Sequence, residues 1–494
     1  MVSAIRSAAV RLLHCPSRSR LLGNAAPREA ARASIHTDAV TFDHITELAS
    51  KPLHPLTLAD LAKHGRPPLS KRALLASANF TLSILPARLA HRIQSLRNLP
   101  FIVVSNPHIS KIHGNYVRSL TSLLPWAERD ITTLEDEIRF TEVMADLVQT
   151  HADTISILAR GFLEARKYIS PKEVTRFLDE HLRARIGTRL IAEQHIALHM
   201  SSRPHIDQPS SGTSSRSDSP DSSFIGVIDT ALCPASTIRH CESTVSDICE
   251  LKYGVRPSVR INGEPGYTFA HIPVHLEYIL TELLKNAFRA TIEKGAEREP
   301  IEVTIAPRKE PQPLAGADSK PALHATTITH AVQGNLDEAS HLIGASNELA
   351  DLTGYEAPPS ARHLDATTAP IRTLSPSTPG VTIRIRDRGG GIAPDNYARI
   401  WNYSFTTFSE DTIRAAMNGA ANGGGSGAIS AVDALNAISG AGADAGTSLA
   451  GLGYGLPLGR AYAEYFGGGI AVQSMWGWGT DVYLSLRGLG VGDQ

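Results

Sequence analysis

Apolar side chains recur three and four residues apart over most of the first 200 residues, a spacing that predicts helices. The pattern is clearest in Pro86–Leu96, Ala145–Ala165 and Pro171–His199. A proline suits the first turn of a helix, where its missing backbone N–H costs nothing, so Pro86 and Pro171 indicate helix starts. Three to five antiparallel helices form a bundle most simply. We therefore predict a helical domain over residues 41–203.

After residue 224 apolar and polar residues alternate in short stretches, which indicates strands with one buried face. Predicted strands lie near Phe224 and at Ser258–Gly263, Ile301–Ala306, Val381–Ile385, Ile470–Ser474 and Asp481–Leu486, and predicted helices at Pro234–Tyr253, Leu276–Lys294 and Leu458–Phe466. Strands with helices between them predict a mixed sheet covered by helices on one face, an α/β sandwich. The predicted fold class is α+β, with the bundle first.

Three stretches follow neither pattern. Residues 204–223 are polar and rich in serine, and residues 309–380 are rich in Pro, Ala, Ser and Thr. Such segments bury too little apolar surface to fold, so we predict insertions. Residues 409–448 hold a glycine-rich run and many alanines, which favours mobility. The second domain is therefore predicted over residues 224–490, interrupted twice.

Residues 1–36 have a composition of their own. Arginines are spread among Ser, Ala and Leu, and Glu29 is the one acidic residue. This composition is typical of a mitochondrial transit peptide. The alternative is a basic tail without fixed structure, and in either case the segment is excluded from the fold.

The overall composition narrows the function classes. The chain has 494 residues, long enough for two domains, and 48 basic residues against 49 acidic ones. This balance gives no global field that would favour nucleic acid or a membrane surface. The four cysteines form no C-x-x-C pair, which favours neither a zinc site nor a disulfide framework. No apolar run approaches the roughly 18 residues of a membrane helix, so we predict no membrane span.

The predicted helix Leu276–Lys294 carries candidate chemistry. Glu282 and Asn286 are four residues apart, as are Lys285 and Arg289, so each pair lies one turn apart on one side of the helix. Magnesium takes few protein oxygens and keeps waters and phosphates, so one Asn carbonyl can suffice. For this motif alone, the alternative is an amphipathic helix whose polar side faces water.

Two glycine-rich stretches extend this pattern. Asp387 ends a predicted strand and is followed by Gly389–Gly391, which presents a fixed carboxylate with room for a ligand at the backbone. In Gly451–Pro457 the glycines let backbone N–H groups wrap a phosphate, and the helix that begins near Pro457 adds its positive end. Together with the helix motif, these stretches predict a site for a nucleotide and magnesium.

The motifs ELLKN, DRGGG and GLGYGLP resemble the nucleotide-binding boxes of the GHKL ATPase superfamily, and GTDVYLSL resembles its last strand. More narrowly, ELLKNAFRAT and GLGYGLPLGRAYAEYFGG resemble the mitochondrial 2-oxoacid dehydrogenase kinases, the pyruvate and branched-chain enzymes. Leu99–Leu120 and Phe177–His199 resemble their regulatory helical bundle, which in that family docks the lipoyl domain of the acyltransferase core. The resemblance implies a mitochondrial matrix protein with a GHKL α/β sandwich, in which residues 409–448 correspond to the ATP lid.

The resemblance also implies residue roles at a site for ATP and Mg²⁺. Glu282 would be the general base, Asn286 would hold Mg²⁺, and Lys285 and Arg289 would neutralise phosphate charge. The implied nucleotide-binding residues are Asn286, Arg289, Asp387, Gly391, Thr406, Thr407, Gly451, Leu452, Gly453, Tyr454, Gly455, Leu456 and Thr480. Among them, Asp387 would accept from the adenine amine, with Thr480 beside it.

Further features of the family carry over less completely. His151 matches a histidine that the family places near the catalytic carboxylate and is therefore a candidate catalytic residue beside Glu282 and Lys285, although a lone histidine on a helix is more often structural. Tyr278 stands where the pyruvate enzymes usually have a histidine one turn before the base, so a Glu–His dyad is not expected. Some members bind K⁺ through backbone oxygens near Ile400–Phe405.

The resulting hypothesis is a serine kinase that phosphorylates the decarboxylase α-subunit of a mitochondrial 2-oxoacid dehydrogenase complex and inactivates it. The motifs LPFIVVSNP and KYGVRPSVRING lean toward the branched-chain complex, with the pyruvate complex left open. The family suggests a homodimer formed through the sheet domains. Two alternatives stand beside it: a histidine kinase of the same superfamily, and a nucleotide-gated scaffold that binds lipoyl domains without catalysis.

Overall fold

A computed structural model describes residues 42–202, 223–308, 379–403, 405 and 453–489. The predicted transit peptide at 1–36, the predicted ATP lid at 409–448 and nearly all of the insertions at 204–223 and 309–380 lie outside the described residues.

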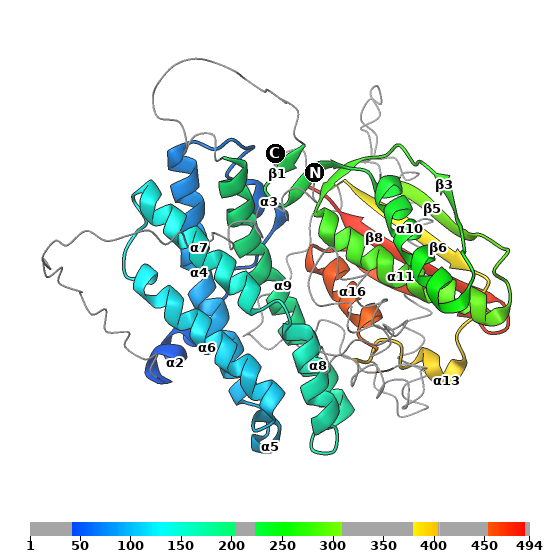
Figure 1. The fold of residues 1–494 in the computed structure, drawn as a ribbon, viewed down its shortest axis with the longest axis horizontal. Helices are drawn as coiled ribbons and strands as arrows, with labels where there is room; N and C mark the ends of the chain where they lie inside the picture. Colours follow the sequence, from blue (N-terminus) through cyan, green and yellow to red (C-terminus); the bar gives the residue numbers. More distant parts are fainter. Residues whose placement is uncertain (1–41, 203–222, 309–378, 404, 406–452, 490–494) are drawn as a thin grey trace, which may run out of the picture.

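The first part of the chain is helical, as predicted (Figure 1). Its helices are α2 (Phe42–Ser50), α3 (Leu58–Ala62), α4 (Lys71–Arg97), α5 (Phe101–Val104), α6 (Pro107–Ala127), α7 (Leu134–Thr150), α8 (Thr154–Ala165) and α9 (Pro171–Ser201). α9 begins where its proline predicted, because the Ser170 hydroxyl accepts from the Glu173 N–H and the Glu173 carboxylate accepts from Ser170 in return.

Two helix boundaries differ from the predicted ones. α4 begins at Lys71 after the N-cap Ser70, and Pro86 lies inside the helix. The proline forgoes one backbone hydrogen bond, but most side chains of α4 around it, such as Leu85 and Leu89, are buried, so packing holds the helix together. The predicted run Ala145–Ala165 is broken at His151, which caps α7, before α8 starts. The apolar period continues across this break because both helices pack on the same core.

Among the described helices, α4 alone is long and apolar enough by composition to cross a membrane, contrary to our expectation from the sequence. The apolar window is 61% buried inside the protein, as in the core helix of a bundle. Its apolar character is therefore explained by packing against α6 and α9.

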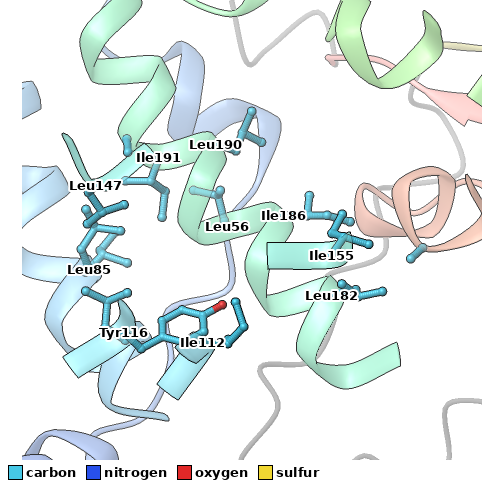
Figure 2. Packing of buried hydrophobic residues seen from close by; sticks show 14 of the residues in the cluster. Leu56, Leu85, Ile112, Tyr116, Leu147, Ile155, Leu182, Ile186, Leu190 and Ile191 are labelled. Carbon is cyan, nitrogen blue, oxygen red and sulfur yellow. The ribbon is translucent and has the colours of Figure 1, made fainter. Parts of the chain in front are cut away.

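The bundle core is continuous with the second domain. Figure 2 shows part of the packing, with Ile155 and Ile186 on the side of the bundle that faces α16. Leu458 and Ala461, both from α16, are buried in the same cluster as the bundle residues. The labelled side chains are Leu56, Leu85, Ile112, Tyr116, Leu147, Ile155, Leu182, Ile186, Leu190 and Ile191. The two domains thus share apolar contacts rather than a purely polar seam.

The second domain is a mixed sheet with helices on one face (Figure 1). Its strands are β3 (Val259–Gly263), β5 (Ile301–Arg308), β6 (Gly380–Asp387), β7 (Gly469–Met475) and β8 (Gly479–Arg487), in the order β3-β5-β6-β8-β7. Its helices are α10 (Pro234–Tyr253), α11 (Pro273–Lys294), the short α13 (Pro394–Tyr397) and α16 (Gly455–Tyr465). β3 and β5 are parallel and the other neighbours antiparallel. The α+β class predicted from the sequence is confirmed.

A second, three-stranded sheet lies where the two domains meet. It consists of β1 (Phe224–Ile225), β2 (Ile228–Leu232) and β4 (Phe269–His271), in the order β1-β2-β4. Ile225 and Ile228 belong to the bundle cluster, whereas Leu232 and Phe269 belong to the core of the large sheet. β4 has only three residues, too short a stretch for its alternation to be recognised in the sequence.

Candidate functional site

Helix α11 carries the first group of predicted site residues. Pro273 starts it and Gly295 ends it in the left-handed conformation, with φ of 75°, which suits glycine. Its buried face packs against the sheet, so its polar residues stay on the opposite side. Lys285 Nζ donates to Glu282 Oε1 at 2.5 Å, and both side chains are largely buried. Asn286, one turn after Glu282, is exposed.

The glycines after β6 bring the second motif against the same helix. A methyl group at Gly389 would overlap Ala290 of α11, and one at Gly390 would lie 3.2 Å from the Lys294 Cδ. Only glycine permits this close approach. The DRGGG loop therefore lies against the last turns of α11, at Ala290 and Lys294.

Asp387 is the buried carboxylate of this loop, only 7% exposed. It accepts from the backbone N–H of Gly389 at 2.8 Å and from that of Thr480, its partner in the β6–β8 ladder. Burial raises the pKa of Asp387 to about 6, although these two N–H donors act to lower it. A carboxylate fixed in this way has oxygen lone pairs left to accept from an amine.

The β7–β8 hairpin closes this end of the site. Gly391 has φ of 74°, and a methyl group there would overlap the Met475 carbonyl. The Ser474 hydroxyl accepts from the Ile392 N–H at 2.7 Å and lies 3.2 Å from the Thr480 hydroxyl. A cavity of about 320 Å³ opens here, lined by Arg386, Asp387, Arg388, Gln473, Ser474, Met475, Trp478, Gly479, Thr480 and Asp481. Sequence reasoning missed Ser474, since no motif marks a serine that joins two loops.

The third motif leads into α16. Gly453 has φ of 75° and approaches the Phe405 carbonyl so closely that a methyl group would overlap it. Tyr454 is buried, with its ring centroid 5.4 Å from that of Tyr403. A methyl group at Gly455, the first residue of α16, would overlap Glu282 Oε2. Leu456 packs on the core of the sheet domain. The amide end of α16 thus adjoins the carboxylate of α11.

His151 lies within the bundle. Its Nε2 is 3.0 Å from the Ser119 hydroxyl, its ring is 4.4 Å from that of Tyr116, and its carbonyl accepts from Arg185 at 3.0 Å. Burial, followed by the positive charge of Arg185, lowers the pKa of His151 to about 3, so the imidazole is neutral. These contacts hold the break between α7 and α8, and they join His151 to bundle residues rather than to Glu282.

Tyr278 lies one turn before Glu282, at the position where the pyruvate enzymes usually have a histidine. Its ring centroid lies 5.1 Å from that of Tyr462 on α16. Burial, helped by the negative charge of Glu282, raises the pKa of Tyr278 well above its usual value. The phenol therefore stays protonated and does not serve as a base.

The structure brings residues from the three motifs together along α11. Gly389 contacts α11 near its end and Gly455 contacts Glu282 near its middle, while Asp387 and Thr480 lie side by side on adjacent strands. Thr406, Thr407, Gly451 and Leu452 lie outside the described residues. The site has the buried Asp387 carboxylate at one end and the N-terminus of α16 beside the Glu282 carboxylate at the other. Such an arrangement can hold the nucleobase at the first end and the phosphate chain of a nucleotide at the second.

Comparisons with known proteins show which proteins this chain resembles. The family model described as mitochondrial branched-chain alpha-ketoacid dehydrogenase kinase matches residues 55–229. The chain is similar to pyruvate dehydrogenase (acetyl-transferring) kinase 1, mitochondrial, of Saccharomyces cerevisiae, with 28% identity over 90% of this chain and 86% of the yeast protein. It is 27% identical to the corresponding mitochondrial kinase of Arabidopsis thaliana over 88% of this chain and 90% of the plant protein. Isozyme 4 of Mus musculus is 24% identical over 90% of this chain and 86% of the mouse protein.

The family model covers the bundle and the first strands, whereas the relatives match 88–90% of the chain. The family model and the relatives both name mitochondrial kinases of 2-oxoacid dehydrogenases. On this evidence the chain is similar over 88–90% of its length to mitochondrial 2-oxoacid dehydrogenase kinases, and residues 55–229 match the model of that kinase family.

Proposed function

We propose that this protein transfers the γ-phosphate of ATP to a serine of the decarboxylase α-subunit of a mitochondrial 2-oxoacid dehydrogenase complex and thereby inactivates that complex. The observation that carries the proposal is the contact between Gly455 and Glu282. It places the N-terminal end of α16, where backbone N–H groups favour phosphate, beside a largely buried carboxylate. The named relatives act on pyruvate dehydrogenase, which supports the substrate class.

In the proposed complex the adenine amine donates to the Asp387 carboxylate, with Thr480 beside it. Lys285 and Arg289 balance the phosphate charge. Among the described residues no group of three or more His, Cys, Asp or Glu side chains is placed to hold a metal. The exposed Asn286 amide fits Mg²⁺ held chiefly by phosphates and water. When bound, Mg²⁺ would neutralise charge on the phosphates.

Glu282 is the proposed general base. Its Oε1 accepts from Lys285, which fixes the carboxylate, while Oε2 faces Gly455. The serine oxygen forms a bond to the γ-phosphorus, the bond to the leaving ADP oxygen breaks, and Glu282 takes the hydroxyl proton. Positioning and charge neutralisation supply most of the catalysis in phosphoryl transfer.

The proposal extends to the partners of the family. The bundle would dock the lipoyl domain of the acyltransferase core, and two copies would associate through their sheet domains. K⁺ bound near Ile400–Phe405 would be a second ion. His151 would support the site from the bundle, since its contacts hold the α7–α8 junction.

The test is phosphorylation of purified branched-chain and pyruvate dehydrogenase complexes side by side, with loss of decarboxylase activity as the second readout. We expect acid-stable phosphoserine on the α-subunit of one complex. ATP binding with no phosphate on either complex would overturn the proposal and favour the scaffold.

The nucleotide affinity should depend on the protonation of Asp387. Because the ionised carboxylate is a stronger acceptor for the adenine amine than the protonated one, and the pKa of Asp387 is about 6, protonation at pH 5 weakens binding. We expect the Kd for ADP to rise roughly tenfold between pH 7.5 and 5. Calorimetric titration at each pH measures it.

The control is Asp387→Asn, which keeps the shape of the side chain and removes its titration. This variant should bind ADP weakly, and its remaining pH dependence reports the protonation of the nucleotide itself. If the Kd for ADP depends on pH equally in the wild-type protein and in Asp387→Asn, the proposed contact between Asp387 and adenine is wrong.

A further inference from the structure

Arg183 of α9 is buried between two carboxylates from different domains. Its Nε donates to Asp179 Oδ2, one turn earlier on α9, at 2.8 Å, and its Nη2 donates to Glu464 Oε2 on α16. The Arg183 side chain is 16% exposed and that of Glu464 is 25% exposed. An ion pair so far removed from water is weakly screened, and the forked guanidinium fixes the relative position of its two partners.

The charges at this contact support one another. Burial acts to lower the pKa of Arg183, but the carboxylates of Asp179 and Glu464 outweigh it and raise that pKa. Burial acts to raise the pKa of Glu464, yet Arg183 and Arg460 outweigh it and lower that pKa. Arg183 and Glu464 are therefore both charged at neutral pH. Removing Arg183 would leave two carboxylates in place with one cation fewer between them.

Each carboxylate bound by Arg183 also accepts a second hydrogen bond, Glu464 from Arg460 and Asp179 from Tyr403. Glu464 Oε1 accepts from Arg460 at 2.6 Å, and the Arg460 guanidinium lies 4.9 Å from the Trp401 ring centroid. Asp179 Oδ1 accepts from the Tyr403 hydroxyl at 3.5 Å.

Tyr403 carries the connection to the phosphate end of α16. Its ring packs against that of Tyr454, and the next residue, Gly455, touches Glu282. A continuous series of contacts therefore runs from the bundle helix α9 to both ends of α16 and to the proposed base.

We propose that Arg183 is a positioning residue of the nucleotide site: by holding Asp179 and Glu464 together, it fixes α16 and Tyr403 on the bundle so that the amide end of α16 stays against Glu282. This inference rests on the proposed function for its catalytic consequence. Its consequence for nucleotide affinity holds whichever substrate is phosphorylated.

The apolar contacts between α9 and α16 hold the two helices together, and the forked ion pair adds directional contacts that fix Asp179 and Glu464 relative to Arg183. At the same C-terminal end of α16 as Glu464, the Tyr465 hydroxyl fits against Gly187, where a methyl group would overlap it. With Arg183 gone, α16 keeps this contact at its C-terminal end, but Asp179 is no longer held in place for the Tyr403 hydroxyl. The N-terminal end of α16, which Tyr403 reaches through Tyr454, is then held less firmly where phosphate would bind.

The test is Arg183→Met in the full-length protein, with Arg183→Lys as the conservative variant. We expect Met to raise the Kd for ADP and the KM for ATP by about tenfold. Lys should recover part of this loss, because a single ammonium replaces only one of the two hydrogen bonds of the fork. Arg239→Met is the control, since it breaks an ion pair with Glu242 on α10.

Two measurements separate positioning from mere stability. The urea midpoint reports folding, and the Kd for ADP reports the site. If Arg183→Met lowers the midpoint but binds ADP as tightly as the wild-type protein, the proposal is wrong. If that variant does not fold, Tyr403→Phe, which removes the hydroxyl bonded to Asp179 and keeps the ring, should raise the Kd about twofold. An unchanged Kd there would also overturn it.

The outcome is distinct from a failure of the proposed function. If the wild-type protein binds ADP but phosphorylates no decarboxylase, the proposed function is wrong. The role of Arg183 is then still decided by the Kd for ADP of Arg183→Met. An active kinase whose KM for ATP is unchanged in Arg183→Met removes the role of Arg183 alone.

Discussion

Glu282→Gln should lower the kcat for decarboxylase phosphorylation by at least about a hundredfold, the usual contribution of a general base. Glutamine matches the shape of glutamate, and its carbonyl oxygen can still accept from Lys285, so the helix and the nearby cation stay in place. What it cannot do is accept the proton of the substrate hydroxyl. Nucleotide affinity should therefore stay within about twofold of the wild-type value.

Steady-state phosphorylation of the purified complex gives kcat, and calorimetry with ADP gives the Kd. The matched control is Glu277→Gln, on the same helix, whose carboxylate lies 3.5 Å from His240 and away from Lys285. Phosphorylation at the wild-type rate by Glu282→Gln would show that another group takes the proton.

The periodic parts of this fold were predictable because local spacing determines them. α10 spans the predicted residues, α11 begins earlier than predicted, at Pro273, and α9 ends later than predicted, at Ser201. Predicted helix boundaries were wrong where packing in the core outweighed the preference of a single residue. Pro86 indicated a helix start, yet it lies inside α4 because the side chains around it are buried on the bundle core.

The candidate site was predictable only as separate motifs. Nothing within ELLKN or GLGYGLP states that Gly455 touches Glu282, because that contact depends on how α16 packs across α11. Ser474 and Arg183 were not identified at all. Each acts through a residue distant in sequence, Ile392 for one and Glu464 for the other, and neither belongs to a motif.

Gly455→Ala should reduce kcat/KM for ATP-dependent phosphorylation by more than about tenfold. The added methyl group would overlap Glu282 Oε2, so the carboxylate or the start of α16 must move. Either shift separates the proposed base from the helix end that faces the phosphates. Misplacement of about 1 Å at a reacting group can cost a hundredfold in rate.

Gly459→Ala, one turn later on the same helix, is the matched control. A methyl group there lies 3.8 Å from Ile470 Cδ1, an ordinary contact, so the site is undisturbed. Alanine inside a helix is favoured over glycine by about 0.5–1 kcal/mol, so this variant should unfold at a slightly higher urea concentration than the wild-type protein. Because both substitutions add one methyl group to α16, only contact with Glu282 distinguishes them. Equal activities in the two variants would place the proposed base elsewhere.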